Sequence, residues 1–190
     1  MAKRKRTNPS RVPVSIDKID RHELIASVSH GNMYYAWLLI IPVLIQQEGV
    51  PAKRVIELWD VVNNFVSAPD FVGERLNQEL YGLERGISSH APYPSIPFDS
   101  IRTLADLEAV RRKLKKNAIY SAICMILAGL HSTGEFDYKL LRRIYLNAEL
   151  TLAEIEHGST SYDELRAWAI KENILIAEDQ DEMSMVTTEE

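Results

Sequence analysis

The pattern of apolar and polar positions is dominated by two apolar stretches, residues 33–45 and 118–130, each followed by a glycine four residues later. Each stretch has 13 residues, fewer than the roughly 18–20 that a helix needs to cross a bilayer. Because so few polar residues interrupt them, we expect both to form helices that are buried in the core. The sequence therefore predicts no membrane segment.

The two stretches share a register, because three residues recur at the same displacement of 85 positions. They are Asn32, Tyr35 and Gly49, which recur as Asn117, Tyr120 and Gly134. Since a second helix and a short third helix are expected after each stretch, we predict two related three-helix units that arose by internal duplication. The alternative is a pair of unrelated helical hairpins, because helical proteins share such patterns freely.

Apolar residues recur at helical spacing after each stretch. In the first half, the helix expected after Pro51 carries the stripe Val55, Leu58, Trp59, Val62, Phe65 and Val66. In the second half, the stripe is Leu141, Ile144, Tyr145, Ala148, Leu152 and Ile155. No long alternating run indicates a strand, so the fold class is predicted to be all-α.

Capping residues and prolines mark the expected ends of these helices. Helix starts are predicted at three capping boxes and one single cap, namely Ser67 with Asp70, Thr103 with Asp106, Ser161 with Glu164, and Asp137. Pro42 lies inside the first apolar stretch, where it removes a helical hydrogen bond and crowds the preceding turn. We therefore expect a kink or break at residues 39–41.

Composition divides the chain into five parts. Residues 1–14 form a basic arm that we predict to be flexible, and residues 15–86 form the first helical unit. Residues 87–102 contain three closely spaced prolines and are predicted to be a linker. The second helical unit spans residues 103–177, and the acidic tail at 178–190 is predicted to be disordered.

The first half resembles a group of uncharacterised small helical proteins carried by phages and integrated elements of Gram-positive gut bacteria. The likeness covers roughly residues 4–87 and is carried by Lys-Arg-Thr-Asn-Pro at 5–9, Val-Pro-Val-Ser at 12–15, Glu48-Gly49, and Leu-Trp-Asp-Val-Val-Asn at 58–63. The chain departs from that pattern at Pro42 and in the third helix. The resemblance implies a mobile-element setting, in which accessory proteins bind DNA or disarm host defences, and it transfers no functional residues.

Residues that carry catalytic or metal chemistry are not arranged in any recognisable pattern. The single cysteine, Cys124, lies in an apolar stretch, which excludes an internal disulfide and favours a reducing, cytoplasmic setting. The five histidines lack metal-ligand spacing, and the eight glycines form no phosphate-binding loop. We therefore expect a protein that is not an enzyme and has no metal or cofactor.

Charge is unevenly distributed, and this is the strongest functional feature of the sequence. The net charge is −5, but the arm is strongly basic and the tail strongly acidic. Cations that could bind a partner fall into three groups: Lys3, Arg4, Lys5 and Arg6; Arg111, Arg112, Lys115 and Lys116; and Arg142 and Arg143. The second group lies on one helix face, and the third could extend it. The simpler explanations are a solubilising arm and a solvated helix face.

These features lead to three hypotheses about function. The first is a non-enzymatic phage or mobile-element binding protein that inhibits a host nucleic-acid-guided nuclease, an anti-CRISPR type of role. The second is a DNA-binding accessory or regulatory protein, for which helices at 138–156 and 162–172 form a candidate helix-turn-helix with Arg166 and Lys171 as readers. The third is a structural protein that forms a homodimer.

Overall fold

The computed structural model describes Leu24, residues 32–67 and residues 101–175. In this part of the chain the regular elements are all helices: α2 (Asn32–Pro42), the π-helix η3 (Val43–Gln47), α3 (Ala52–Ser67), α5 (Leu104–Ser132), α6 (Tyr138–His157) and α7 (Tyr162–Lys171). The all-α prediction is confirmed for these residues. The basic arm, the acidic tail, the third helix of the first unit and nearly all of the proline-rich linker lie outside the described residues.

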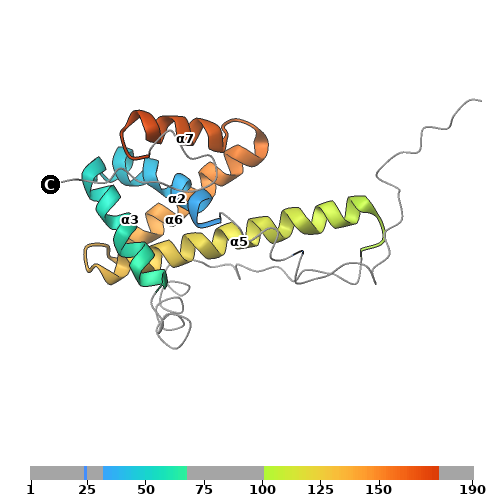
Figure 1. Cartoon of the computed structure of the whole chain (residues 1–190), viewed down its shortest axis with the longest axis horizontal. Coiled ribbons are helices and arrows are strands. Elements are labelled where there is room, and N and C mark those ends of the chain that lie inside the picture. The colour runs from blue at the N-terminus through green and yellow to red at the C-terminus, as the bar shows by residue number, and fades with distance from the viewer. Residues whose placement is uncertain (1–23, 25–31, 68–100, 176–190) are drawn as a thin grey trace, which may run out of the picture.

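Helix α2 occupies the centre of the fold. Residues 36–41 are all buried, so this helix has no solvent-facing side along that length. It packs against α5, α6 and α7, which enclose it (Figure 1). A helix that is apolar on every side can be stable only inside such an enclosure, and the prediction of a buried central helix is confirmed here.

Helix α5 contains the second apolar stretch and is the longest element. Its 29 residues extend about 43 Å at 1.5 Å per residue. Residues 126–130 are fully buried, whereas the N-terminal part extends beyond the other helices (Figure 1). There it forms a small separate cluster, in which Val110 packs with Leu24 and Ile101. None of the helices in the described residues is both long and apolar enough to span a bilayer.

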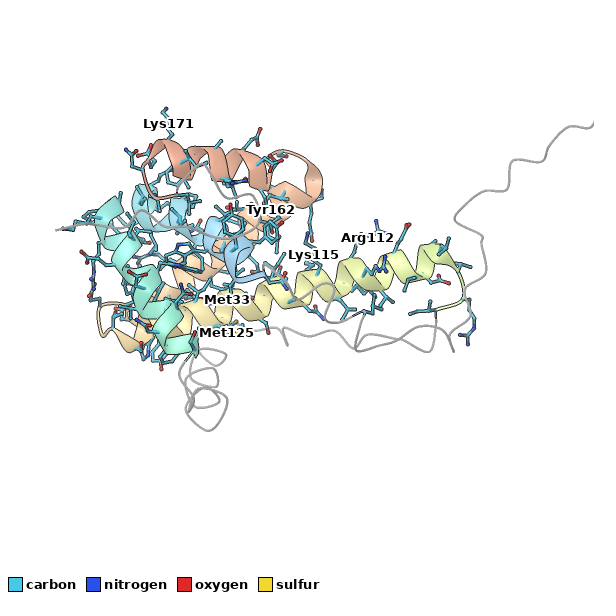
Figure 2. The ribbon with its side chains drawn as sticks, viewed as in Figure 1. Met33, Arg112, Lys115, Met125, Tyr162 and Lys171 are labelled. Atoms are coloured by element: carbon cyan, nitrogen blue, oxygen red, sulfur yellow. The ribbon has the colours of Figure 1, made fainter. Side chains whose placement is uncertain are left out.

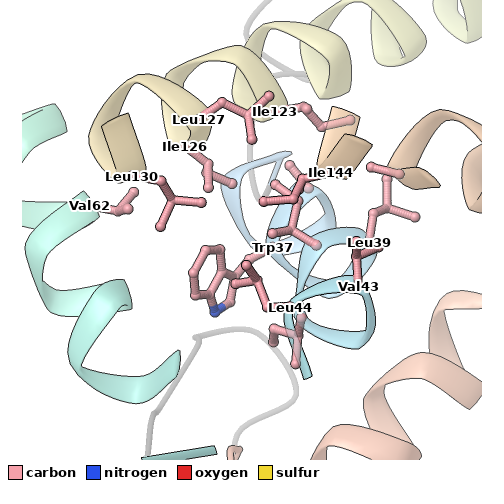
Figure 3. Close-up of a cluster of buried hydrophobic side chains, with 14 of the residues drawn as sticks. Trp37, Leu39, Val43, Leu44, Val62, Ile123, Ile126, Leu127, Leu130 and Ile144 are labelled. Atoms are coloured by element: carbon pink, nitrogen blue, oxygen red, sulfur yellow. The ribbon is translucent and has the colours of Figure 1, made fainter. Parts of the chain in front are cut away.

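The two halves share one hydrophobic core. Side chains from α2, α3, α5 and α6 meet in a single cluster around Trp37 (Figure 3). At one contact, a Cβ on Gly129 of α5 would lie 3.0 Å from Cγ2 of Val62 in α3, so glycine permits the close approach of these helices. The predicted apolar stripes of α3 and α6 face this core, and the described helices of both halves pack as one body.

The packing of the halves is reciprocal. Helix α3 of the first half packs on α5, while α6 of the second half packs on α2. Two ion pairs also join the halves reciprocally. Glu48 after η3 pairs with Arg143 of α6, and Glu135 after α5 pairs with Arg54 of α3. Each turn that ends a central helix is thereby tied to the second helix of the other half.

Pro42 changes the hydrogen-bonding pattern of the first apolar helix without ending it. The α-helix continues through Pro42, and the next turn widens into the π-helix η3, where the Glu48 N–H donates to the Val43 carbonyl at 3.1 Å. We expected a kink or a break at residues 39–41; the helix does not break there, and the irregular turn follows Pro42. Burial of residues 36–41 keeps that turn helical, so the perturbation appears in the following turn.

The ends of the helices follow the predicted local chemistry. Two of the three predicted capping boxes form, those at Thr103 and Ser161, and the Asp137 carboxylate accepts from the Leu140 N–H at 2.7 Å. The third pairs Ser67 with Asp70, which lies outside the described residues. Gly49 and Gly134 adopt left-handed φ values of 69° and 77° after the two central segments, a conformation that favours glycine. These two glycines, which share a register in the sequence, therefore perform the same task in the structure.

Candidate nucleic-acid or partner interface

One side of α5 changes from apolar to cationic along its length. Ile119, Ile123 and Ile126 face the core. Lys115 precedes Ile119 by four residues and Arg112 precedes it by seven, so these cations continue the same side of the helix. The cationic face, defined as Arg111, Arg112, Lys115 and Lys116, begins where α5 leaves the protein body (Figure 2).

Most of the cationic face is exposed. Arg111, Arg112 and Lys115 are exposed, and none of these three forms an ion pair within the described residues. Leu114 packs against the small cluster around Val110. The helix is thus anchored on one side by apolar contacts and presents cations on another.

Lys115 links the cationic face to a row of aromatic rings. Its Nζ lies 5.0 Å from the centroid of the Tyr35 ring, within cation–π range. The Tyr35 ring lies 4.7 Å from that of Tyr162 and 5.6 Å from that of Tyr34. These three residues, here called the tyrosine cluster, are partly exposed and join α2 to the start of α7 (Figure 2).

Burial raises the pKa of two phenol groups of this cluster, those of Tyr34 and Tyr162. Burial raises the pKa of Tyr162, and the neighbouring Tyr35 and Glu156 raise it further. The Tyr162 hydroxyl is buried and makes no hydrogen bond within the described residues. Burial also raises the pKa of Tyr34, while Arg166 opposes this effect and Asp163 reinforces it. Tyr34 and Tyr162 therefore offer neutral rings flanked by charged groups.

Lys116 has an internal role that distinguishes it from the other cations. Its Nζ is 2.9 Å from a carboxylate oxygen of Glu156 in α6 and 5.9 Å from the Tyr120 ring. Burial raises the pKa of Tyr120 to about 12, with a further contribution from Glu149. Because both ends of the Lys116–Glu156 pair are partly exposed, the pair contributes at most about 1 kcal/mol to stability.

Arg142 and Arg143 do not extend the cationic face. Helices α5 and α6 run antiparallel, and the Lys116–Glu156 contact sets their alignment, which puts residues 142–143 about 20 Å along the hairpin from Lys116. Arg143 instead donates to both carboxylate oxygens of Glu48, at 3.1 and 2.8 Å. This contact strengthens the guanidinium's hold on its proton and raises the pKa of Arg143.

A pocket lies at that far end of the hairpin. It has a volume of about 610 Å³ and is lined by residues that include His131, Glu135, Asp137, Lys139 and Arg143. The charges in its lining are of both signs, and His131 is occupied in stacking on Tyr138, with ring centroids 4.5 Å apart. The lining therefore does not favour a ligand of either charge.

The candidate helix-turn-helix is partly occupied by packing. Ala169 of α7 is fully buried, and Leu165 and Trp168 pack beside it against α2. The charge of Arg166, in the middle of α7, opposes the effect of burial on the pKa of Tyr34. Lys171 is exposed at the C-terminal end of α7, away from the cationic face (Figure 2), and five residues turn it about 140° around the helix from Arg166. The two proposed readers therefore do not form one surface. The other predicted cations, Lys3, Arg4, Lys5 and Arg6, lie outside the described residues.

Sequence reasoning missed the tyrosine cluster. The adjacent Tyr34 and Tyr35 are visible in the sequence, but their contacts with Lys115 and Tyr162 join distant segments. Cys124 is partly buried and packs against the core. Within the described residues, no three His, Cys, Asp or Glu side chains are grouped so that they could hold a metal. No family model, curated protein or solved structure matches this chain.

Proposed function

We propose that this chain is a non-enzymatic binding protein whose cationic face engages nucleic acid, either alone or within a nucleoprotein complex. The observation that supports this most directly is the change of α5 from a buried apolar side to an exposed cationic one. Folding alone does not require this concentration of positive charge on the projecting part of a helix. Cations placed in this way bind phosphates through release of counterions.

In its most specific form, the proposal is that the protein inhibits a host nucleic-acid-guided nuclease and acts in the cytoplasm. The resemblance of residues 4–87 to proteins of phages and integrated elements supports a role against host defence. An acidic chain with a localised cationic face also suits a nucleoprotein target, because its negative charge disfavours indiscriminate coating of DNA.

A cleavage assay tests this proposal. The purified protein is added to a guide-loaded nuclease and its target DNA, in parallel with a variant carrying Arg112→Glu and Lys115→Glu. The expected result is inhibition by the native chain and loss of inhibition by the variant. Unimpaired cleavage by a panel of guided nucleases at saturating protein would contradict the inhibitor role.

The second candidate is a DNA-binding accessory protein, and the same cationic face supports it. This function predicts that duplex DNA alone is bound at physiological salt and that the double charge reversal abolishes binding. A gel-shift titration without any nuclease separates it from the inhibitor proposal.

The third candidate is a structural protein that self-associates, and α6 supplies the relevant surface. Leu146 is 44% exposed and Leu150 is 63% exposed, one helical turn apart on the same side. Light scattering after size exclusion tests this candidate, and a dimer that Leu150→Glu dissociates would support it.

We also propose that the halves arose by duplication. The reciprocal packing of α3 on α5 and α6 on α2, with the exchanged glutamate–arginine pairs, supports a common origin. The equivalent left-handed glycines at 49 and 134 add to this support.

A further inference from the structure

We propose that the ligand of the cationic face is single-stranded nucleic acid, with its phosphates along α5 and its bases against the tyrosine cluster. This inference rests on the proposed function and names the chemical class of its partner. It depends on the way in which cations and aromatic rings alternate across three helices.

The alternation starts on α5 and ends on α7. Arg112 and Lys115 stand on neighbouring turns of α5, and Lys115 lies over Tyr35. The ring of Tyr34 lies 5.6 Å from that of Tyr35. The charge of Arg166 on α7 opposes the effect of burial on the pKa of Tyr34. A backbone-binding cation next to partly exposed rings is the arrangement with which proteins hold single strands.

The cations supply the phosphate contacts. Arg111, Arg112 and Lys115 are exposed on the side of α5 that adjoins the rings, whereas Lys116 is engaged by Glu156. Three such contacts with a single strand predict that the logarithm of affinity falls with the logarithm of salt concentration with a slope of about −2. This slope is a direct measure of how many of the three cations take part.

The tyrosines favour a single strand over a duplex. In a duplex the ring faces of the bases are hidden in the stack, so the tyrosine cluster would have nothing to contact. An unpaired base of any kind presents a π-face to a neutral ring such as Tyr34. The expected binding therefore tolerates different sequences, and it requires strands that are unpaired.

Asp163 provides an opposing charge that makes the path of the strand testable. It lies in the first turn of α7, directly after Tyr162, whose ring is 4.7 Å from that of Tyr35, and its charge contributes to the raised pKa of Tyr34. A strand that passes over Tyr34 brings phosphates toward this carboxylate, which repels them. Asp163→Asn should therefore tighten binding, whereas a strand that follows α5 alone would be unaffected.

The experiment is a fluorescence anisotropy titration of the full chain. The probes are a labelled oligothymidine of about 20 nucleotides, which exceeds the usual site size, a duplex of the same length, and heparin. The variants are Arg112→Gln with Lys115→Gln, Tyr34→Leu, Asp163→Asn and, as a matched control, Lys53→Gln on the exposed side of α3. Thermal unfolding followed by circular dichroism verifies that each variant is folded.

The expected results separate phosphate contacts from base contacts. The native chain should bind the single strand about tenfold more tightly than the duplex. The double glutamine variant should weaken binding to all three probes and make the salt slope shallower. Tyr34→Leu should weaken binding to the single strand alone by about tenfold, Asp163→Asn should strengthen it, and Lys53→Gln should leave it unchanged.

Three other outcomes would overturn the inference. Equal affinity for the single strand and the duplex, with no effect of Tyr34→Leu, would show that no base contacts the tyrosine cluster. The proposed function would survive that result if the variant with Arg112→Gln and Lys115→Gln still bound all three probes more weakly. Binding confined to a nuclease free of nucleic acid would identify an acidic protein surface as the ligand. Failure to bind any of the probes or any guide-loaded nuclease would overturn the proposed function as well.

Discussion

The two ends of α5 use the same side of one helix for opposite purposes. In the C-terminal half, that side is buried against α2 and α3, with Ile123 and Leu127 fully enclosed. In the N-terminal half, it carries Arg112 and Lys115 into solvent. Substitutions in the first region should affect stability, and those in the second should affect binding. The comparison therefore separates residues that hold the fold from residues that are available for a partner.

The largest expected effect comes from a cavity in the buried half. Leu127→Ala removes a side chain with no solvent exposure, which should lower the free energy of unfolding by about 3 kcal/mol. Urea denaturation followed by circular dichroism measures this change. Arg112→Ala is the matched variant in the cationic half and should change stability by less than about 0.5 kcal/mol. Equal losses at the two sites would contradict the comparison.

A smaller loss is expected where α5 and α3 approach most closely. In Gly129→Ala the new Cβ would lie 3.0 Å from Cγ2 and 3.2 Å from the Cα of Val62. The clash should cost about 1–3 kcal/mol, reduced by the roughly 1 kcal/mol that alanine adds to helix propensity. The midpoint of urea unfolding measures the net effect. An increase in stability would show that the helices separate without strain.

Local sequence chemistry accounts for much of this fold. Capping boxes at Thr103 and Ser161 depend on contacts within four residues, and the apolar stripe of α6 depends only on helical periodicity. Such features are visible in a sequence because every contributing residue is nearby. The same is true of the cationic face itself, whose members were predicted to share one side of a helix.

The rest of the candidate site could not be predicted because it depends on contacts between distant segments. Arg143 was expected near the cationic face, yet the antiparallel pairing of α5 and α6 carries it to the far end of the hairpin, where it meets Glu48. Tyr35 lies beside Lys115 only because α2 packs on α5. The π-turn after Pro42 likewise reflects how tightly the preceding turn is held in the core.

Charge reversal should distinguish the cationic face from the other cations of the second half. Arg112→Glu combined with Lys115→Glu should weaken binding to a polyanion by tenfold or more, since two phosphate contacts are lost and two repulsions are added. Arg142→Glu should have a much smaller effect, because this residue lies at the far end of the hairpin. Affinity for heparin, measured by anisotropy or calorimetry, makes the comparison. A comparable loss in Arg142→Glu would mean that the binding surface extends along α6.

The smallest predicted effect concerns the Lys116–Glu156 pair. Glu156→Gln removes the carboxylate that holds Lys116 at 2.9 Å and makes that cation available to a partner. Polyanion binding should then strengthen by about two- to threefold, while stability changes by no more than about 1 kcal/mol. The same titration measures both the affinity and its salt dependence. Weaker binding in this variant would indicate that the pair positions α5 for binding.

The central claim is that the cationic face of α5 binds a polyanionic strand. The most direct measurement is the salt dependence of single-strand affinity for the native chain and for the variant with Arg112→Gln and Lys115→Gln. The claim predicts a slope of about −2 for the native chain and a slope near −0.7 for the variant, because one of three cations remains. Identical slopes and affinities in the two proteins would contradict it.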